Sequence, residues 1–265
     1  MNSNEPKFSA DLYRDGRPLY PKAIFRGLER ALGSTPSISF PIFLDLGCGT
    51  GQSTRSFLEL GISQTGFALD PDAAMITLAG TATHGRFPDV GYSVASAESI
   101  PLPANSVDLV LVGSAIHWFD LSLTRPEIER VLKPGGFLFV FEYQFPKCLT
   151  DANLEEIVRR RFNLEWKAPN QKPRGTLSEI LAPFSKSEGW TLESDERPEW
   201  RERLSLSEFL GLLFSQSRYL HAEAAVSDPI AYRQEVASFF TPYFREEPPL
   251  FDFKPRALVL KKQSC

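Results

Sequence analysis

The sequence predicts a doubly wound α/β fold, and two patterns predict it. From residue 41 onward, short apolar runs alternate with segments of helical periodicity, and the apolar runs lack the polar alternation of half-exposed strands. Strands that are apolar on both faces and separated by helices are typical of a parallel sheet covered on both sides. The length of 265 residues suits one large domain, or one domain with a sizeable insertion, and not two independent enzymes.

The order of elements up to residue 143 follows from these patterns. Strands are expected at 42–46, 64–69, 90–95, 107–113 and 137–143, and helices at 51–60, 71–79 and about 126–132. Thr124 and Glu127 have capping-box spacing with Pro126 between them, which predicts that the third helix begins there. The Lys133-Pro134-Gly135-Gly136 run predicts a turn before the fifth strand.

The alternation stops after Pro146. Charged helical sequence is expected over 149–189, one or two strands over 190–204, helices from 206 to about 219 and over 228–240, and a last strand over 257–260. Ser205 and Glu208 form a capping-box pair that opens the helix at Leu206. The second half therefore adds edge strands to the sheet and inserts helices suited to a lid.

Composition favours a small-molecule partner. The net charge of -4 provides no global basic surface for releasing counterions from a nucleic acid. No apolar run approaches the roughly 20 residues needed to span a bilayer, and the polar first ten residues lack the apolar core of a signal peptide. We therefore expect a soluble, cytoplasmic protein, either monomer or dimer. The 21 phenylalanines suit a large core or an apolar pocket equally well.

No metal is expected. Cys48, Cys148 and Cys265 are too few and too scattered for a disulfide framework or a zinc site, and they are most simply free thiols. His84 and His221 also lack the spacing of metal ligands.

A glycine-rich loop joins the first predicted strand to the first predicted helix, where an open α/β sheet places its ligand crevice. Its sequence is Asp45-Leu46-Gly47-Cys48-Gly49-Thr50-Gly51-Gln52. A dinucleotide fingerprint requires a glycine where Gln52 stands, so nicotinamide binding is disfavoured. The Asp45 carboxylate at the head of the loop suits an ammonium group better than a pyrophosphate.

Asp45 to Gly51 resembles motif I of class I S-adenosylmethionine-dependent methyltransferases. Further landmarks fall in the order of that family: Asp70 ending the second strand, Ala97-Glu98 after the third, the 102–108 run before the fourth and the 132–136 turn before the fifth. The resemblance covers roughly residues 38–145. It implies a Rossmann-like, mostly parallel seven-stranded sheet with helices on both faces, S-adenosyl-L-methionine as cofactor and S-adenosyl-L-homocysteine as product.

The resemblance also implies roles for individual residues. The cofactor-binding set is Asp45, Gly47, Gly49, Gly51, Asp70, Pro71, Ala97, Glu98 and Ser114. Asp45 would act on the methionine end, although it also suits the N-terminal dipole of the following helix. Asp70 would accept the ribose hydroxyls, or else cap the helix after Pro71. Ala97 would meet the adenine through backbone groups, and Glu98 either joins it or is merely exposed.

Looser matches narrow the subfamily. Residues 8–21, 115–120, 204–211 and 215–219 resemble the type 11 methyltransferases that include trans-aconitate methyltransferase-like enzymes. We therefore expect a single methyltransferase domain over 1–265. Its parts would be an N-terminal helical lid segment over 1–37, a cofactor-binding core over 38–145, and C-terminal edge strands with an inserted helical substrate lid over 146–265.

The candidate catalytic residue is His117, just beyond the fourth strand. Its titration near neutral pH suits a general base, but a cofactor or substrate contact and a structural role stay open, because a carboxylate acceptor needs no base. The candidate substrate-binding residues are Tyr13, Arg17, Tyr20, Trp118, Tyr143 and Tyr219. Arg17 would pair with a substrate carboxylate or form a salt bridge on the surface or in the lid.

The expected activity is transfer of a methyl group from S-adenosylmethionine to a small-molecule acceptor, at a carboxylate or hydroxyl oxygen. One alternative is carbon methylation of a quinone-like or lipid-like acceptor, for which the phenylalanines would line a pocket. Others are a catalytically silent cofactor-binding regulator and, against Gln52, a dinucleotide oxidoreductase. Fold alone does not distinguish these activities.

Overall fold

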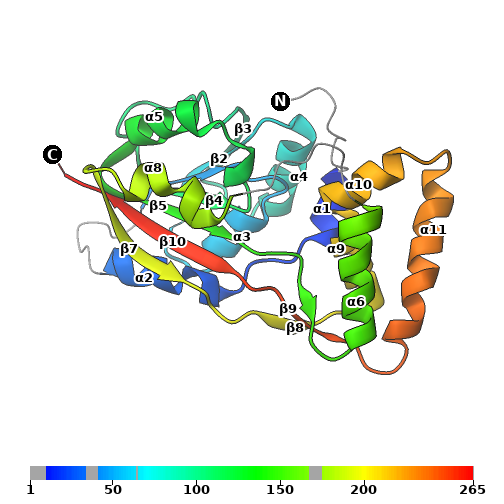
Figure 1. Ribbon diagram of the computed structural model, residues 1–265. Helices are drawn as coiled ribbons and strands as arrows, with labels where there is room; N and C mark the ends of the chain where they lie inside the picture. Colours follow the sequence, from blue (N-terminus) through cyan, green and yellow to red (C-terminus); the bar gives the residue numbers. More distant parts are fainter. Residues whose placement is uncertain (1–9, 34–40, 64, 167–174, 265) are drawn as a thin grey trace. The chain divides into compact units, whose positions relative to one another are not determined.

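The computed structural model describes residues 10–33, 41–63, 65–166 and 175–264 (Figure 1). Parts of the expected segments at 1–37, 64–69 and 149–189, and Cys265, lie outside the described residues. The chain forms two compact units. The core unit comprises Leu19–Gln144, Arg174–Glu199 and Lys254–Cys265, and the second unit comprises Met1–Pro18, Phe145–Pro173 and Trp200–Phe253.

The core unit contains a seven-stranded sheet in the order β3-β2-β1-β4-β5-β10-β7. The strands are β1 (Phe43–Leu46), β2 (Gly66–Asp70), β3 (Val90–Val94), β4 (Val107–Gly113), β5 (Leu132–Glu142), β7 (Trp190–Glu196) and β10 (Arg256–Lys262). The first five run parallel, and β10 pairs antiparallel with both β5 and β7. The predicted doubly wound fold with C-terminal edge strands is confirmed.

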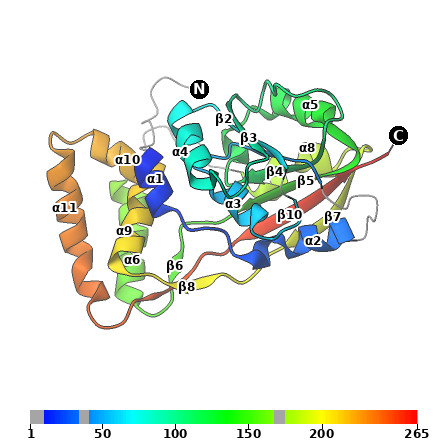
Figure 2. The same ribbon diagram turned by 180° about the vertical axis from the view of Figure 1, so that it is seen from behind.

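Helices cover this sheet. They are α2 (Arg26–Gly33), α3 (Gln52–Leu58), α4 (Ala73–Thr83), α5 (Leu121–Val131), α7 (Leu177–Ile180) and α8 (Ala182–Ser185), with the short helical turns η1 (Lys22–Phe25) and η2 (Ile116–Trp118). Both views show α2 beside β10 and β7 (Figures 1 and 2).

The two faces of the sheet bury different side chains. Leu44, Val110 and Val140 belong to an aliphatic cluster that includes Ile128 of α5 and Leu181. On alternate strand positions, phenylalanines pack with those of η1 and α3: Phe25, Phe43, Phe57, Phe139 and Phe141, with ring centroids 4.8–6.3 Å apart. These five rings are fully buried or nearly so, and burial of each contributes roughly 1.5–3 kcal/mol. Many of the phenylalanines that the composition left unassigned therefore form core.

The predicted start of the third helix was wrong. Helix α5 begins at Leu121, and Asp120 caps it by accepting the amide N–H of Ser122. Thr124 and Pro126 lie inside the helix. Glu127 does not reach back to the helix N-terminus but binds Arg130 and the amide of Ile100. The cap three residues upstream supplies the turn that the capping-box spacing was taken to mark.

The second unit contains helices and a small sheet. Its helices are α1 (Ala10–Gly16), α6 (Ala152–Arg160), η3 (Arg161–Glu165), α9 (Leu206–Phe214), α10 (Ser217–Ala224), α11 (Pro229–Phe240) and η4 (Thr241–Phe244). Strands β6 (Lys147–Cys148), β9 (Leu250–Asp252) and β8 (Arg201–Arg203) pair antiparallel. The predicted capping box of Ser205 and Glu208 is confirmed at the start of α9.

The predicted helix from 206 to about 219 is in fact two helices. Ser215 and Gln216 interrupt it, and both side chains donate hydrogen bonds to the carbonyl of Leu212. Polar side chains that bind the last carbonyls of a helix favour its termination. None of the described helices is long and apolar enough to cross a membrane.

Candidate cofactor-binding site

The loop after β1 holds its shape through left-handed glycines. Gly47, Gly49 and Gly51 have φ angles of 68°, 54° and 85°. The amides of Gly47 and Cys48 both donate to the carbonyl of Leu69, which ties the loop to the end of β2. A Cβ atom on Gly47 would stand 2.7 Å from the Cβ of Ala115, beyond β4. Backbone therefore occupies space that any other residue would fill, which forms a cradle for a ligand.

Asp45 lies beneath this loop at full burial. One carboxylate oxygen, Oδ2, accepts hydrogen bonds of 2.6 Å from the hydroxyls of Ser53 and Thr54 on α3. The other, Oδ1, accepts no hydrogen bond from the described residues. Burial raises the pKa of Asp45 to about 6, against the lowering effect of the two hydroxyls. A buried carboxylate with one oxygen to spare fits a cationic group of a ligand.

Asp70 ends β2 and carries a second carboxylate toward the same loop. Its Oδ2 accepts the amide of Gly49 and its Oδ1 the amide of Asp72, each at 2.9 Å. Asp72, and not Asp70, caps α4 by accepting the amide of Ala74. Burial raises the pKa of Asp70. Each oxygen retains a lone pair for a further donor.

The other predicted cofactor residues lie around these two. Pro71 is exposed directly after Asp70, and Ala97 is buried in the loop after β3. Glu98 is not merely exposed, because its Oε1 accepts the amide of Asp120 at 3.0 Å. Gln52, which replaces the last glycine of a dinucleotide fingerprint, is buried and accepts the Thr50 hydroxyl at 2.6 Å.

Beyond β4 and β5, three predicted residues meet. Ser114 has a left-handed φ of 54°, unusual for a side chain-bearing residue. Its hydroxyl accepts a 3.0 Å hydrogen bond from the Tyr20 hydroxyl, and the Tyr20 ring packs 5.7 Å from that of Tyr143. The Tyr20 amide donates to Ser56 on α3. Backbone strain at the carboxyl end of a parallel strand is typical of functional sites.

His117 and Trp118 lie together in η2, with ring centroids 5.0 Å apart. His117 is half-buried and Trp118 is 42% exposed.

Three predicted substrate residues belong to the second unit. Arg17 donates to the hydroxyl of Ser215 at 2.9 Å and lies over the Tyr13 ring. Tyr219 is fully buried against Trp166, Phe214 and Tyr232, and its hydroxyl has no hydrogen-bond partner among the described residues.

Other chemistry finds little support in the part of the chain that is described. That part contains no cluster of three or more His, Cys, Asp or Glu side chains able to hold a metal ion. Burial raises the pKa of the Cys48 thiol well above its usual value, so the thiol stays protonated at neutral pH.

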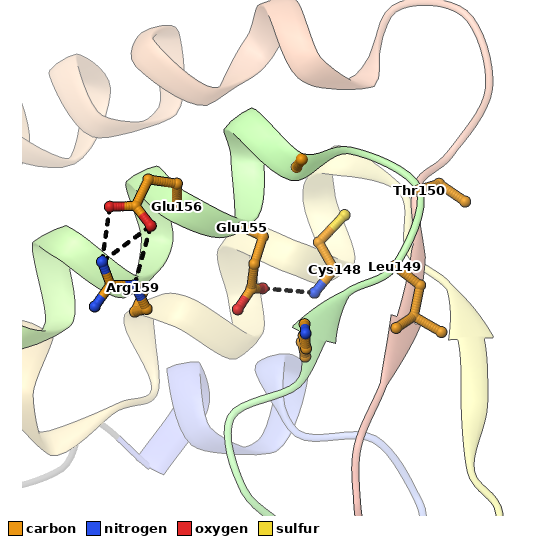
Figure 3. Close-up of a pocket in the computed structure, with 8 residues that line it drawn as sticks. Cys148, Leu149, Thr150, Glu155, Glu156 and Arg159 are labelled. Atoms are coloured by element: carbon orange, nitrogen blue, oxygen red, sulfur yellow. Dashed lines mark hydrogen bonds and ion pairs between the residues drawn. The ribbon is translucent and has the colours of Figure 1, made fainter.

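A separate pocket of about 510 Å³ opens beside α6 in the second unit (Figure 3). Its Glu155 accepts the amide of Cys148, and its Glu156 pairs with Arg159, both at 2.8 Å. These groups bind one another, and none of the predicted site residues lines the pocket.

Sequence reasoning missed Ser53 and Thr54, the two hydroxyls that hold Asp45. Their signal was their place in the first helical turn after the glycine loop, where side chains return toward the end of the preceding strand.

Comparison with known proteins identifies the family. A family model described as a methyltransferase domain matches residues 44–140. An uncharacterized methyltransferase of Mycobacterium tuberculosis is 39% identical over 215 residues, covering 81% of this chain and 77% of that protein. A solved protein of Anaeromyxobacter dehalogenans, provisionally named a type II methyltransferase, is 27% identical, with a TM-score of 0.64 over 94% of this chain and 97% of its own.

Two further relatives have named acceptors. A malonyl-[acyl-carrier protein] O-methyltransferase of Marinomonas is 34% identical, covering 53% of this chain and 50% of that protein. A demethylmenaquinone methyltransferase of Chlorobaculum parvum is 26% identical, covering 69% and 67%.

Proposed function

Since the chain belongs to the class I S-adenosylmethionine-dependent methyltransferases, we propose that it methylates a carboxylate or hydroxyl oxygen of a small molecule. The observation that carries the proposed cofactor site is the buried Asp45 carboxylate, whose Oδ1 accepts no hydrogen bond from the described residues. An ammonium is the group that this oxygen fits, and S-adenosylmethionine bears one at its methionine end.

The residues around Asp45 suit the rest of that cofactor. The left-handed loop over 47–51 lets backbone approach the methionine end closely. Asp70 would accept from the ribose hydroxyls through its remaining lone pairs, and the loop bearing Ala97 and Glu98 would border the adenine. When bound, the cofactor supplies an electrophilic sulfonium methyl group. The chain's contribution is alignment of the acceptor with that group.

An oxygen acceptor is supported by the edge formed after β4 and β5. Because the Ser114 hydroxyl accepts from Tyr20, its own hydrogen is directed elsewhere and suits an acceptor oxygen. His117 would assist as a base for a hydroxyl acceptor, whereas a carboxylate needs none. The packing of Phe25, Phe43, Phe57, Phe139 and Phe141 as core removes them from a quinone-sized pocket and weakens the case for carbon methylation.

Several narrower expectations stay predictions. They are the likeness to trans-aconitate methyltransferases, the lid role of the helices, and the substrate roles of Tyr13, Arg17, Trp118 and Tyr219.

Calorimetric titration tests the cofactor. The purified protein is titrated with S-adenosylmethionine, S-adenosylhomocysteine and NADH, and the titrations are repeated on Asp70→Ala. We expect micromolar binding of the two adenosyl ligands alone, weakened by the substitution. Binding of NADH alone, or of none of the three to folded protein, would contradict the proposal.

A methyl-transfer screen tests the acceptor. Radiolabelled S-adenosylmethionine is incubated with panels of carboxylic acids, phenols, amines and quinols. We expect product from the carboxylate or hydroxyl panels. Product confined to the quinols, with carbon methylation, would replace the oxygen proposal, and product confined to the amines would also contradict it.

A further inference from the structure

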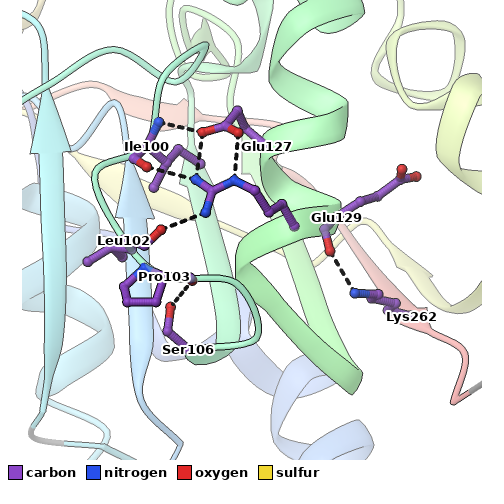
Figure 4. A network of polar contacts seen from close by, with 8 residues as sticks. Ile100, Leu102, Pro103, Ser106, Glu127, Glu129 and Lys262 are labelled. Atoms are coloured by element: carbon purple, nitrogen blue, oxygen red, sulfur yellow. Dashed lines mark hydrogen bonds and ion pairs between the residues drawn. The ribbon is translucent and has the colours of Figure 1, made fainter.

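An arginine of α5 binds the loop that follows β3. The guanidinium of Arg130 donates to the carbonyl oxygens of Ile100 and Leu102 at 2.8 and 2.7 Å (Figure 4). It also pairs with both carboxylate oxygens of Glu127, one turn earlier, at 2.8 Å. Glu127 in turn accepts the amide of Ile100 at 2.7 Å. The pair therefore holds both the donor and the acceptor of one peptide residue.

The segment held in this way has no regular structure to fix it. Residues 95–106 contain neither helix nor strand. The Ala95 amide donates to the carbonyl of Asp70, which anchors the start of the segment at the end of β2. The Glu127–Arg130 pair anchors Ile100. Residues 96–99, which include Ala97 and Glu98, thus span two fixed points.

Helix α5 is itself held at both ends. Near its start, the amide of Asp120 donates to Glu98. At its end, the ammonium of Lys262 on β10 donates to the carbonyls of Glu129 and Leu132 at 2.6 and 2.7 Å (Figure 4). A helix fixed by the sheet can impose its position on the loop.

Ion-pair energy does not account for this arrangement. The side chains of Arg130 and Glu127 are 36% and 22% exposed, and pairs so exposed contribute at most about 1 kcal/mol. What the planar guanidinium adds is geometry, because its fork meets two carbonyls and a carboxylate at once.

We propose that Glu127 and Arg130 are positioning residues that fix segment 96–99 for recognition of the adenine base. The inference rests on the proposed function, since it takes this segment as the border of the adenine. It predicts that loss of the fork blurs the distinction between adenine and a base with a different edge.

The test compares S-adenosylhomocysteine with S-inosylhomocysteine, in which a carbonyl replaces the amino group of the base. Calorimetry gives the affinity of each ligand for the wild-type protein, Arg130→Gln and Arg130→Lys. We expect the wild type to prefer adenine. Both variants should bind S-adenosylhomocysteine about tenfold more weakly, as loss of a charged hydrogen bond implies, and should lose most of the preference. Lysine restores charge but not the fork, so it should not rescue.

The matched control is Arg125→Gln. Arg125 pairs with Glu129 on the same helix at 2.8 Å, and neither side chain has a recorded contact with residues 96–102. We expect it to lower the melting temperature as much as Arg130→Gln does while leaving both affinities within about twofold.

Three results would overturn the inference: no base preference in the wild type, equal weakening of both ligands in the Arg130 variants, or full rescue by lysine. Failure of the wild type to bind S-adenosylhomocysteine at all would instead overturn the proposed function, and the inference with it. Should Arg130→Gln not fold, Arg130→Lys gives the same readouts.

Discussion

The end of β1 and the loop after β3 treat their charged groups in opposite ways. Beneath the glycine loop, the Asp45 carboxylate is fully buried and its Oδ1 accepts no hydrogen bond from the described residues. Beside the loop after β3, the partly exposed Arg130 guanidinium donates to two carbonyls and a carboxylate. The first region leaves a costly polar group unmatched, and the second saturates a cheap one.

This contrast separates binding from shaping. A buried charge without a full set of partners destabilises the free protein, so its persistence indicates a partner that arrives with the ligand. A saturated, half-exposed arginine contributes little energy and mainly fixes backbone geometry. Changes at Asp45 should therefore alter affinity and pH dependence, whereas changes at Arg130 should alter selectivity.

The largest effect is expected from Gly47→Ala. The added Cβ would require a left-handed backbone and would stand 2.7 Å from the Cβ of Ala115. We expect S-adenosylhomocysteine affinity to fall at least about 100-fold and the free energy of unfolding to drop by about 2–3 kcal/mol, as strain and overpacking together imply. Calorimetry and urea denaturation measure the two quantities.

Gly61→Ala is the control for Gly47→Ala. Gly61 has a similar φ of 71°, but a Cβ there would meet no atom within 4 Å. We expect about 1 kcal/mol of destabilisation from backbone strain and unchanged affinity. Equal effects of the two substitutions on affinity would show that the loop is not a ligand cradle.

Asp45→Asn should weaken S-adenosylhomocysteine binding at pH 8 by about 100-fold, because the amide keeps the shape but removes the charge that an ammonium requires. Affinity is measured by calorimetry, and circular dichroism verifies the fold. A loss below about threefold would remove Asp45 from the ammonium site.

The stability of the ligand-free protein should carry the signature of the raised Asp45 pKa. The folded carboxyl has a pKa of about 6 and the model value is 3.8. Between these values the folded state holds more protons, so this group's contribution to the free energy of unfolding falls as pH rises from about 4 to 6. The total change is up to about 3 kcal/mol. Urea denaturation across this range should show a shallower fall for Asp45→Asn than for the wild type; equal slopes would contradict the buried, unmatched carboxylate.

The smallest effect is expected from Tyr20→Phe, which removes the hydroxyl bound to Ser114 but keeps the ring. We expect a destabilisation of about 1 kcal/mol, S-adenosylhomocysteine affinity within about threefold, and a raised KM for the acceptor found by screening. Tyr92→Phe, which loses a comparable bond to Thr83, should leave that KM unchanged. The same KM for both variants would place the Tyr20 hydroxyl outside acceptor binding.

Local sequence predicted the sheet core well, because buried parallel strands and their glycine turns have strong signatures. Strand β4 falls at the predicted 107–113. The start of α5 was missed because Asp120 lacks an acidic partner at capping-box spacing, while Thr124 and Glu127 have that spacing and do not cap. The break between α9 and α10 depends on two side chains returning to Leu212, which periodicity does not register.

The site was predictable where motifs are contiguous and not where contacts are remote. Asp45, the glycines and Asp70 lie around one loop because each follows a neighbouring strand. Arg17 finds Ser215 across 198 positions, and Arg130 reaches Leu102 across 28. Such pairings depend on the three-dimensional path of the chain, and no local pattern marks them.

The most direct test of the central claim is the proton count of ligand binding at pH 6. Calorimetric titration with S-adenosylhomocysteine in buffers of different ionisation enthalpy measures the protons released. An ammonium beside Asp45 would favour the ionised carboxylate, so the wild type should release up to about half a proton and Asp45→Asn markedly less. Equal proton release by the two proteins would mean that Asp45 does not receive the ligand's ammonium group.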